Sequence, residues 1–179
     1  MTRSTLTPQI YVANLRAYNE GKQEGEWIDI SWVTDKDEIL EEIKNVVGED
    51  EWAIHTSEDL GIISEHPDLD KLAEMCPMIE EHGQAFIAWK DYYGGTIQFS
   101  EYENLYYGTF EGCTKSEAMR EFAHEYVDSH HFDTHINDIP LGESNLTDYL
   151  DFERIANDIT VNLFNAFWVD RKLYVFRNR

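Results

Sequence analysis

Acidic side chains fill the middle of this chain, and this feature most restricts what it can fold into. Residues 20–158 carry 35 Asp and Glu against 8 Lys and Arg, a net charge of −27, whereas residues 1–19 and 159–179 have net charges of +2 and +3. Strongly acidic chains often stay disordered because they have too little apolar surface to bury. Here 5 Trp, 10 Tyr and 9 Phe supply a core. We therefore expect a folded protein with a large negative surface.

The first 62 residues read as a small unit of strands around one helix. The alternation in Ile10–Val12 and in Trp27–Ile30 predicts two antiparallel strands, with Gly21 and Gly25 in the turn between them and Trp27 in the core. Trp52–His55 predicts a third strand.

A helix is expected between the second and third of these strands. Asp35 followed by Glu38 is typical of a capping box. Ile39, Ile43 and Val46 then recur at helical spacing, so we expect them to face inward.

Residues 63–104 change to the pattern of a central bundle of short helices. Pro67 suits the first position of a helix, with Leu69, Leu72 and Cys76 inward, and Pro77 should end or kink it. A second helix is expected over residues 84–93 and a third from residue 100. Three glycines predict helix ends: Gly48, Gly83 and Gly94.

Residues 105–179 read as a C-terminal α+β unit. Thr114 with Glu117 predicts a capping box for a helix that extends to about Val127, and residues 146–156 have a second helical pattern. The apolar runs 159–168 and 172–176 predict a hairpin around a turn at residues 170–171. The predicted fold class is α+β, in three small units of an elongated chain.

No catalytic or metal-binding pattern stands out. His130, His131, Asp133 and His135 are the densest set of metal-binding side chains, but a zinc site needs a third or fourth ligand at a fixed distance. The motifs of serine hydrolases, P-loops and dinucleotide-binding loops do not occur. Among 36 carboxylates no pair is distinguished as an acid and base for hydrolysis. We expect no metal, no cofactor and no enzymatic activity.

The chain is expected in the cytoplasm. Residues 1–13 lack the basic and then apolar leader of a secreted protein. No apolar run approaches the roughly 18 residues of a membrane-spanning helix. Cys76 and Cys113 have no CxxC partner, which favours a reducing compartment.

The acidity is explained if the surface imitates DNA. Duplex DNA carries one charge per roughly 1.7 Å of its axis, so a chain with a net charge of −22 matches about 37 Å of duplex. The partner would be a protein whose groove is lined with Lys and Arg, whereas nucleic acids and anionic membranes would be repelled. The carboxylates expected to imitate phosphates lie on predicted helices: Asp37, Glu38, Glu41, Glu42, Asp70, Glu74, Glu80, Glu81, Glu117, Glu121, Glu125 and Asp128.

Two segments of the sequence also carry a family resemblance. The first consists of Ile10–Leu15, Tyr18–Gly21, Gly25 and Trp27. The second consists of Leu146, Tyr149, Asp151, Phe152, Ile155, Ala156 and Asp158. In order and spacing, the two segments resemble ArdA-type antirestriction proteins, which conjugative plasmids and transposons encode, and the second resembles the antirestriction motif of that family.

This resemblance implies a DNA mimic that occupies the DNA-binding groove of a type I restriction–modification enzyme, at its methyltransferase core. It would block restriction and modification of foreign DNA in a bacterial host cell. The resemblance also implies three domains, placed by the local patterns at residues 1–62, 63–104 and 105–179, and a homodimer joined through the third.

The sequence leaves several alternatives open. Tyr149, Phe152 and Ile155 predict a buried helix face that meets either its own core or a second subunit. The mimic's target is alternatively a nuclease, a nucleoid protein or a repair glycosylase. A halophilic cytoplasmic protein would also be acidic, but it would unfold in low salt.

Overall fold

The computed structural model describes residues 5–22, 24–94, 98–130 and 146–179 of the chain. The chain forms two compact units, residues 1–102 and 103–179. Each unit contains, over these described ranges, one three-stranded antiparallel sheet together with helices. The predicted α+β class, with an N-terminal sheet and a C-terminal hairpin, is therefore confirmed. The division into three domains stays a prediction.

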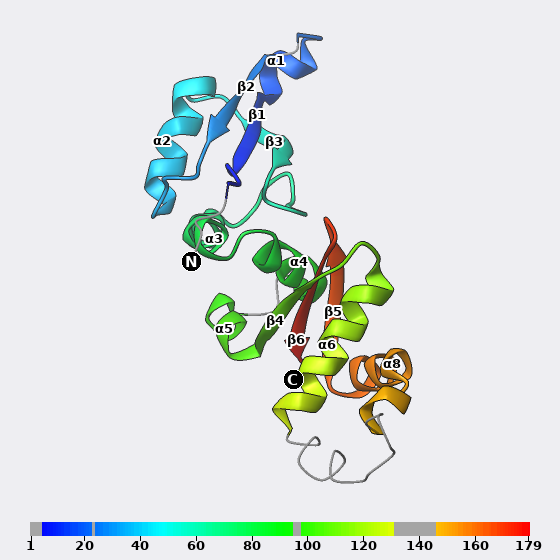
Figure 1. Ribbon diagram of the computed structural model, residues 1–179. Helices are drawn as coiled ribbons and strands as arrows, with labels where there is room; N and C mark the ends of the chain where they lie inside the picture. Colours follow the sequence, from blue (N-terminus) through cyan, green and yellow to red (C-terminus); the bar gives the residue numbers. More distant parts are fainter. Residues whose placement is uncertain (1–4, 23, 95–97, 131–145) are drawn as a thin grey trace. The chain divides into compact units, whose positions relative to one another are not determined.

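The sheet of the first unit has the strand order β2-β1-β3 (Figure 1). Its strands are β1 (Gln9–Asn14), β2 (Gly25–Asp29) and β3 (Trp52–Glu58). The connection from β1 to β2 is longer than the expected turn, because it contains the short helix α1 (Leu15–Asn19). The side chain of Asn14 caps this helix by accepting a hydrogen bond from its third residue, at 3.0 Å.

Helix α2 (Lys36–Val47) contacts β1 and β2 and contributes to the core of the first unit. Its predicted capping box is present, and Ile39 and Ile43 are buried as expected. Val47 is buried as well, whereas Val46, which the helical spacing placed inward, is half-buried. The buried positions are thus four residues apart along the helix.

Two further helices, α3 (Leu69–His82) and α4 (Gln84–Tyr93), follow in the first unit. The prediction that Pro67 opens a helix is wrong, because Asp68 is the N-cap of α3. Pro77 does not end the helix either, since α3 continues to His82. Pro77 lies on the exposed side, so the helix loses one hydrogen bond while its buried side continues to pack.

The first unit ends at an aromatic cluster. A 3₁₀ turn (Phe99–Glu101) leads into the short helix α5 (Tyr102–Leu105). The ring of Tyr102 is buried and lies 5.6 Å from Phe86 and 5.4 Å from Trp89, between ring centroids. These edge-to-face contacts join Tyr102 to α4.

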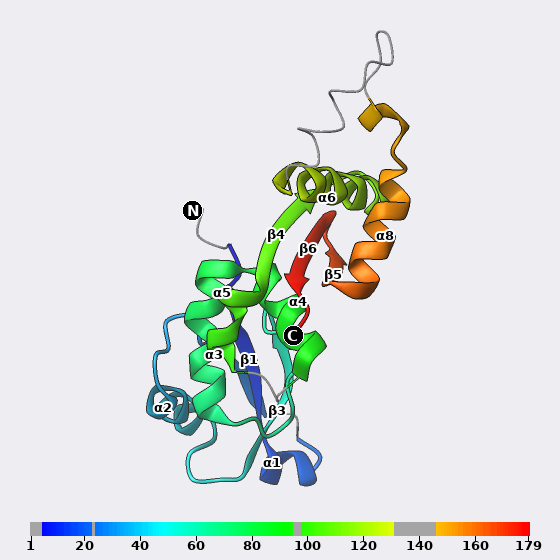
Figure 2. The ribbon, with the colours of Figure 1, turned by 90° about the horizontal axis from the view of Figure 1, so that it is seen from below.

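The second unit has the strand order β4-β6-β5, with β4 (Tyr106–Glu111), β5 (Phe164–Val169) and β6 (Lys172–Arg177). Helices α6 (Lys115–Ser129) and α8 (Phe152–Asn162) pack together and against these strands (Figure 2). A 3₁₀ turn (Leu146–Tyr149) precedes α8.

The hairpin of β5 and β6 starts later than the sequence pattern predicts. Residues 159–162 form the last turn of α8, where the hydroxyl of Thr160 donates to the carbonyl of Ala156 at 2.8 Å. The turn itself is as predicted, because Asp170 and Arg171 connect the strands with φ values of 49° and 64°. Positive φ at both central residues is typical of a two-residue hairpin turn.

None of the described helices combines the length and the apolar character that a membrane span requires.

Candidate functional site

The first candidate carboxylates lie on α2. Asp37 and Glu41 are exposed and one helical turn apart, so they share a face. Glu42 is half-buried. Glu38 is half-buried and has a structural role: its Oε2 accepts a hydrogen bond from the backbone N–H of Thr34 at 2.8 Å and completes the capping box. Asp37 and Glu41 are therefore the carboxylates of α2 best placed to meet a partner.

A second group lies on α3, where Asp70, Glu74, Glu80 and Glu81 are all exposed. Asp70 forms an ion pair with Lys36 of α2, with 3.0 Å between Nζ and Oδ2. The hydrogen bond to Asp70 and the charge of this carboxylate raise the pKa of Lys36. Both side chains are about half exposed, so the pair adds little stability, but it offsets one negative charge. Glu74, Glu80 and Glu81 carry the negative charge of this helix toward solvent.

The third group forms a row along α6. Glu117, Glu121, Glu125 and Asp128 are exposed, whereas Ala118, Phe122 and Val127 of the same helix are buried. Glu117 also completes the predicted capping box, and its Oε2 accepts a hydrogen bond from a backbone N–H at 2.7 Å. The row therefore combines one helix-capping carboxylate with three that point toward solvent.

The α6 row is less closely spaced than the phosphates of one DNA strand, but its charge density is of the same order. From residue 117 to residue 128 a helix rises about 16 Å, so the three intervals between the four carboxylates average about 5.5 Å along the axis. The phosphates of one DNA strand are about 3.4 Å apart along the axis. Like charges four residues apart destabilise a helix by a few tenths of a kcal/mol per pair. The row thus reduces the stability of the chain itself, which favours a role in binding.

The structure answers the question that the antirestriction-like motif left open. Phe152 is 8% exposed and Ala156 is fully buried, and both belong to the core of the second unit. Ile155 is half-buried and packs against that core. This face of α8 therefore meets its own core.

The other residues of the motif lie outside this buried face of α8. Asp151 is the N-cap of α8 and accepts a hydrogen bond from the backbone N–H of Arg154 at 3.0 Å. Asp158 is exposed on the helix. Leu146 begins the 3₁₀ turn. Tyr149 was expected on the buried face, but it lies before the helix and is 70% exposed.

The N-terminal family-like segment forms an aromatic face that sequence reasoning missed. Trp27 was expected in the core but is 40% exposed. It pairs in register with Tyr11 of β1, with 5.6 Å between ring centroids. Gly25 is required beside them, because a Cβ there would lie 2.6 Å from the carbonyl oxygen of Val12 and 2.8 Å from the hydroxyl of Tyr11. Gly21, with φ of 80°, is a turn glycine as expected. The alternation of side chains along the two strands indicates an aromatic face, but only the strand register shows that the rings of Tyr11 and Trp27 are neighbours.

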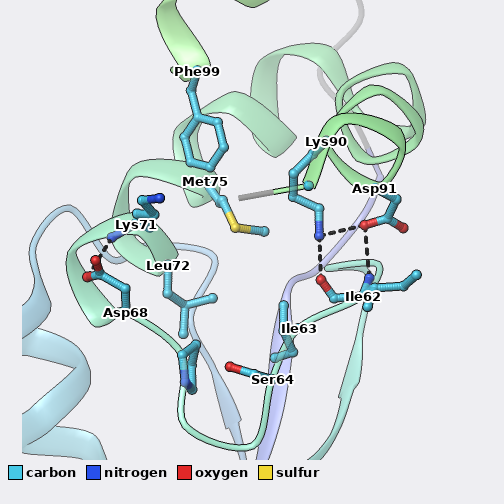
Figure 3. A pocket seen from close by; sticks show the side chains of 12 residues that line it. Ile62, Ile63, Ser64, Asp68, Lys71, Leu72, Met75, Lys90, Asp91 and Phe99 are labelled. Carbon is cyan, nitrogen blue, oxygen red and sulfur yellow. Dashed lines mark hydrogen bonds and ion pairs between the residues drawn. The ribbon is translucent and has the colours of Figure 1, made fainter. Parts of the chain in front are cut away.

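A cavity of about 400 Å³ in the first unit is mainly apolar (Figure 3). Lys90, buried beside it, donates hydrogen bonds to the carbonyls of Leu60 and Ile62 at 2.9 and 2.8 Å, and pairs with Asp91 at 2.7 Å. Asp91 in turn accepts a hydrogen bond from the backbone N–H of Ile62 at 3.0 Å. The polar groups at this cavity therefore fasten the loop after β3 to α4, which is a structural role.

Over residues 5–22, 24–94, 98–130 and 146–179, no three His, Cys, Asp or Glu side chains are grouped to hold a metal ion. His131, Asp133 and His135 lie outside the described residues. His130 is described, and its Nδ1 lies 2.8 Å from the backbone carbonyl of Tyr126.

A sequence model of one protein family matches most of the chain. It bears the description "Antirestriction protein (ArdA)" and matches residues 10–168. Both family-like segments fall within this range. Among curated proteins, no sequence matches the chain.

Proposed function

The chain belongs to the ArdA family of antirestriction proteins, and from this premise we propose that it acts as a DNA mimic. In this proposal its acidic surface occupies the DNA-binding groove of a type I restriction–modification enzyme, at the methyltransferase core. The enzyme can then neither cleave nor modify incoming DNA in the cytoplasm of the bacterial host.

One observation carries the proposal: exposed carboxylates recur on the solvent side of three helices whose other sides are buried. They lie on α2, α3 and α6, in a segment with a net charge of −27. Lys and Arg in a DNA-binding groove are arranged to meet closely spaced negative charges. A folded surface with a similar charge density competes for the same groove.

The proposed mechanism is binding without a chemical step. Association would release the ions held near both charged surfaces, as it does when a protein neutralises DNA phosphates. The bound protein then excludes DNA by occupying its place. Glu38 and Glu117 also cap their helices, and the charge of Asp70 is offset by Lys36. We therefore expect the other exposed carboxylates to contribute most: Asp37, Glu41, Glu74, Glu80, Glu81, Glu121, Glu125 and Asp128.

We also propose that the protein is a homodimer. Residues 159–179 have a net charge of +3, so a contact there brings no acidic faces together. The buried side of α8 is used by its own core, and the exposed apolar side chains at its end support the contact instead: Val161 is 78% exposed and Leu163 is 47% exposed. A twofold contact would repeat this patch on both subunits.

The proposal is tested by competition. A type I enzyme is bound to labelled duplex DNA, and the protein is added over a range of salt concentrations. We expect it to displace DNA at low salt. Its inhibition constant, calculated with the enzyme's affinity for DNA at each salt concentration, should rise by several orders of magnitude between about 50 and 200 mM salt. An inhibition constant that does not change with salt would contradict the mimic.

The same assay separates the other targets. A nuclease, a nucleoid protein and a repair glycosylase are assayed in parallel, and displacement from one of them, without displacement from the type I enzyme, would reassign the target. A halophilic protein is distinguished by unfolding in low salt, where this protein should remain folded.

A further inference from the structure

The outer side of the N-terminal sheet carries a hollow lined by aromatic rings. It has a volume of about 360 Å³ and is bounded by Tyr11, Tyr18, Glu24, Trp27, His55 and Thr56. We name it the aromatic hollow. We propose that it receives an arginine side chain from a basic protein surface, which under the proposed function is the DNA-binding surface of the type I enzyme.

The rings of the aromatic hollow are held in place but remain accessible. Tyr11 lies in β1 opposite Trp27 on one side and Thr56 on the other. Trp27 meets Tyr11 edge-on, at 67° between the ring planes. Tyr18 meets His55 at 84°, with 5.3 Å between centroids. Tyr18 is 54% exposed and Trp27 40%, so both present ring surface to a partner.

Ring faces and a carboxylate together favour a cation. The faces of Trp and Tyr rings attract cations through their π electrons. Glu24, which precedes β2, is exposed and lines the hollow itself. Negative charge beside the rings repels phosphates and attracts Lys or Arg.

The shape of the aromatic hollow favours arginine over lysine. A guanidinium is planar, stacks on aromatic faces and pairs with a carboxylate through two N–H groups, whereas an ammonium is a compact and strongly hydrated charge. The volume lies at the lower end of the range for ligand pockets, about 300–1,000 Å³, which suits one inserted side chain. Arginine that normally contacts DNA phosphates and bases would find a carboxylate and a ring here.

The first experiment uses the full-length protein and no restriction enzyme. The tryptophan indole N–H signals are followed by NMR while an oligoarginine peptide is added, and then an oligolysine peptide of equal length. We expect the signal of Trp27 to move much more with arginine than with lysine. Trp32 is the control, because it is 52% exposed and does not line the hollow. Equal movement of Trp27 and Trp32, or equal effects of the two peptides, would overturn the inference.

The second experiment measures affinity for the type I methyltransferase core. The double variant Tyr18→Ala and Trp27→Ala should bind about tenfold more weakly. Its dependence on salt should match that of the wild type, because no charge is removed. Trp32→Ala should bind like the wild type, and Glu24→Gln, an exposed change that leaves the rings intact, should bind more weakly. Thermal unfolding verifies that each variant is folded.

The two proposals fail in different ways. If the wild type does not bind a type I enzyme, the proposed function is wrong and the peptide titration decides the aromatic hollow alone. The other outcome is that the wild type binds the enzyme and that the double variant and Glu24→Gln both bind with the affinity of the wild type. The aromatic hollow then has no part in the contact, and the proposed function stands.

Discussion

The imidazole ring of His124 lies nearly parallel to the ring of Phe152, with 3.5 Å between their centroids and 20° between their planes. His124 belongs to α6, which carries the acidic row, and Phe152 is the first residue of α8. The antirestriction-like motif thus packs directly against the helix that presents carboxylates. Its aromatic residue supports the acidic surface by holding α6 in place.

Replacing Phe152 by Ala should therefore unfold or strongly destabilise the second unit. Removal of a buried Phe ring costs about 3–5 kcal/mol. The free energy of unfolding, measured by urea denaturation, tests this. Tyr149→Ala is the matched control: Tyr149 lies in the same motif but is 70% exposed, so its loss should change stability by less than about 0.5 kcal/mol. A Phe152→Glu protein that stays folded but becomes monomeric would contradict this packing role.

The two neighbouring acids Glu117 and Glu121 should respond differently to substitution. Glu117→Ala removes the capping interaction with the start of α6, and we expect a loss of about 1 kcal/mol of stability. Glu121→Ala should leave stability unchanged or raise it slightly, because it removes repulsion from like charges one turn away. Urea denaturation of both variants makes the comparison. Equal losses in the two variants would show that the capping box is not the source of the effect.

Inhibition should depend on the number of acids and not on any single one. Each exposed carboxylate contributes a fraction of a kcal/mol, as surface charges do. The triple variant Glu121→Gln, Glu125→Gln and Asp128→Asn should therefore inhibit clearly less than each single variant, with a weaker dependence on salt. Glu121→Asp with Glu125→Asp keeps the charge and serves as the control. Complete loss of activity from one amide substitution would instead point to a catalytic or metal-binding carboxylate.

The buried Lys90 should be essential to the loop after β3. Its side chain is 8% exposed and Asp91 is 26% exposed. Lys90→Met leaves Asp91 and two backbone carbonyls without this donor. We expect the free energy of unfolding to fall by about 3 kcal/mol, the lower end of the range for a buried ion pair that loses one partner. Urea denaturation and hydrogen exchange at Leu60 and Ile62 measure it. Lys71→Met, at an exposed lysine lining the same cavity, should have little effect, and similar losses in both would contradict the role of Lys90.

Local signals predicted the helices well. The pairs Asp35 with Glu38 and Thr114 with Glu117 both form the expected capping boxes. Three of the helices end at the glycines that the sequence indicated. These features depend on the hydrogen bonds of a few neighbouring residues, so the sequence contains the information they need.

Features that depend on distant residues were harder to predict. The run from residue 159 was expected as a strand, but its first turn continues α8, because Ile159 packs on a core made by other elements. Trp27 was expected in the core, although it is 40% exposed on its strand. The sequence did not show whether the apolar face of the motif on α8 packs on its own core or on a second subunit, because a pattern of apolar residues does not identify the surface that buries them.

The two cysteines should differ sharply in reactivity. Cys76 is buried in α3, where its Sγ donates to the carbonyl of Leu72 at 3.4 Å, and burial raises its pKa from 9.0 to about 12. Cys113 is exposed. Because the thiolate is the reactive form, iodoacetamide at about pH 8 should label Cys113 and leave Cys76 unlabelled until the first unit unfolds, as mass spectrometry would show.

The raised pKa of Cys76 also makes the free energy of unfolding depend on pH. The thiol ionises at lower pH in the unfolded chain than in the folded protein, so the stabilisation from the buried neutral thiol is complete below pH 9.0 and is lost between pH 9.0 and about 12. A Cys76→Ala variant should accordingly lose less stability than the wild type over this range. Rapid labelling of Cys76 in the folded protein would contradict its burial. An equal fall in the free energy of unfolding of the wild type and of Cys76→Ala between pH 9.0 and about 12 would contradict it as well.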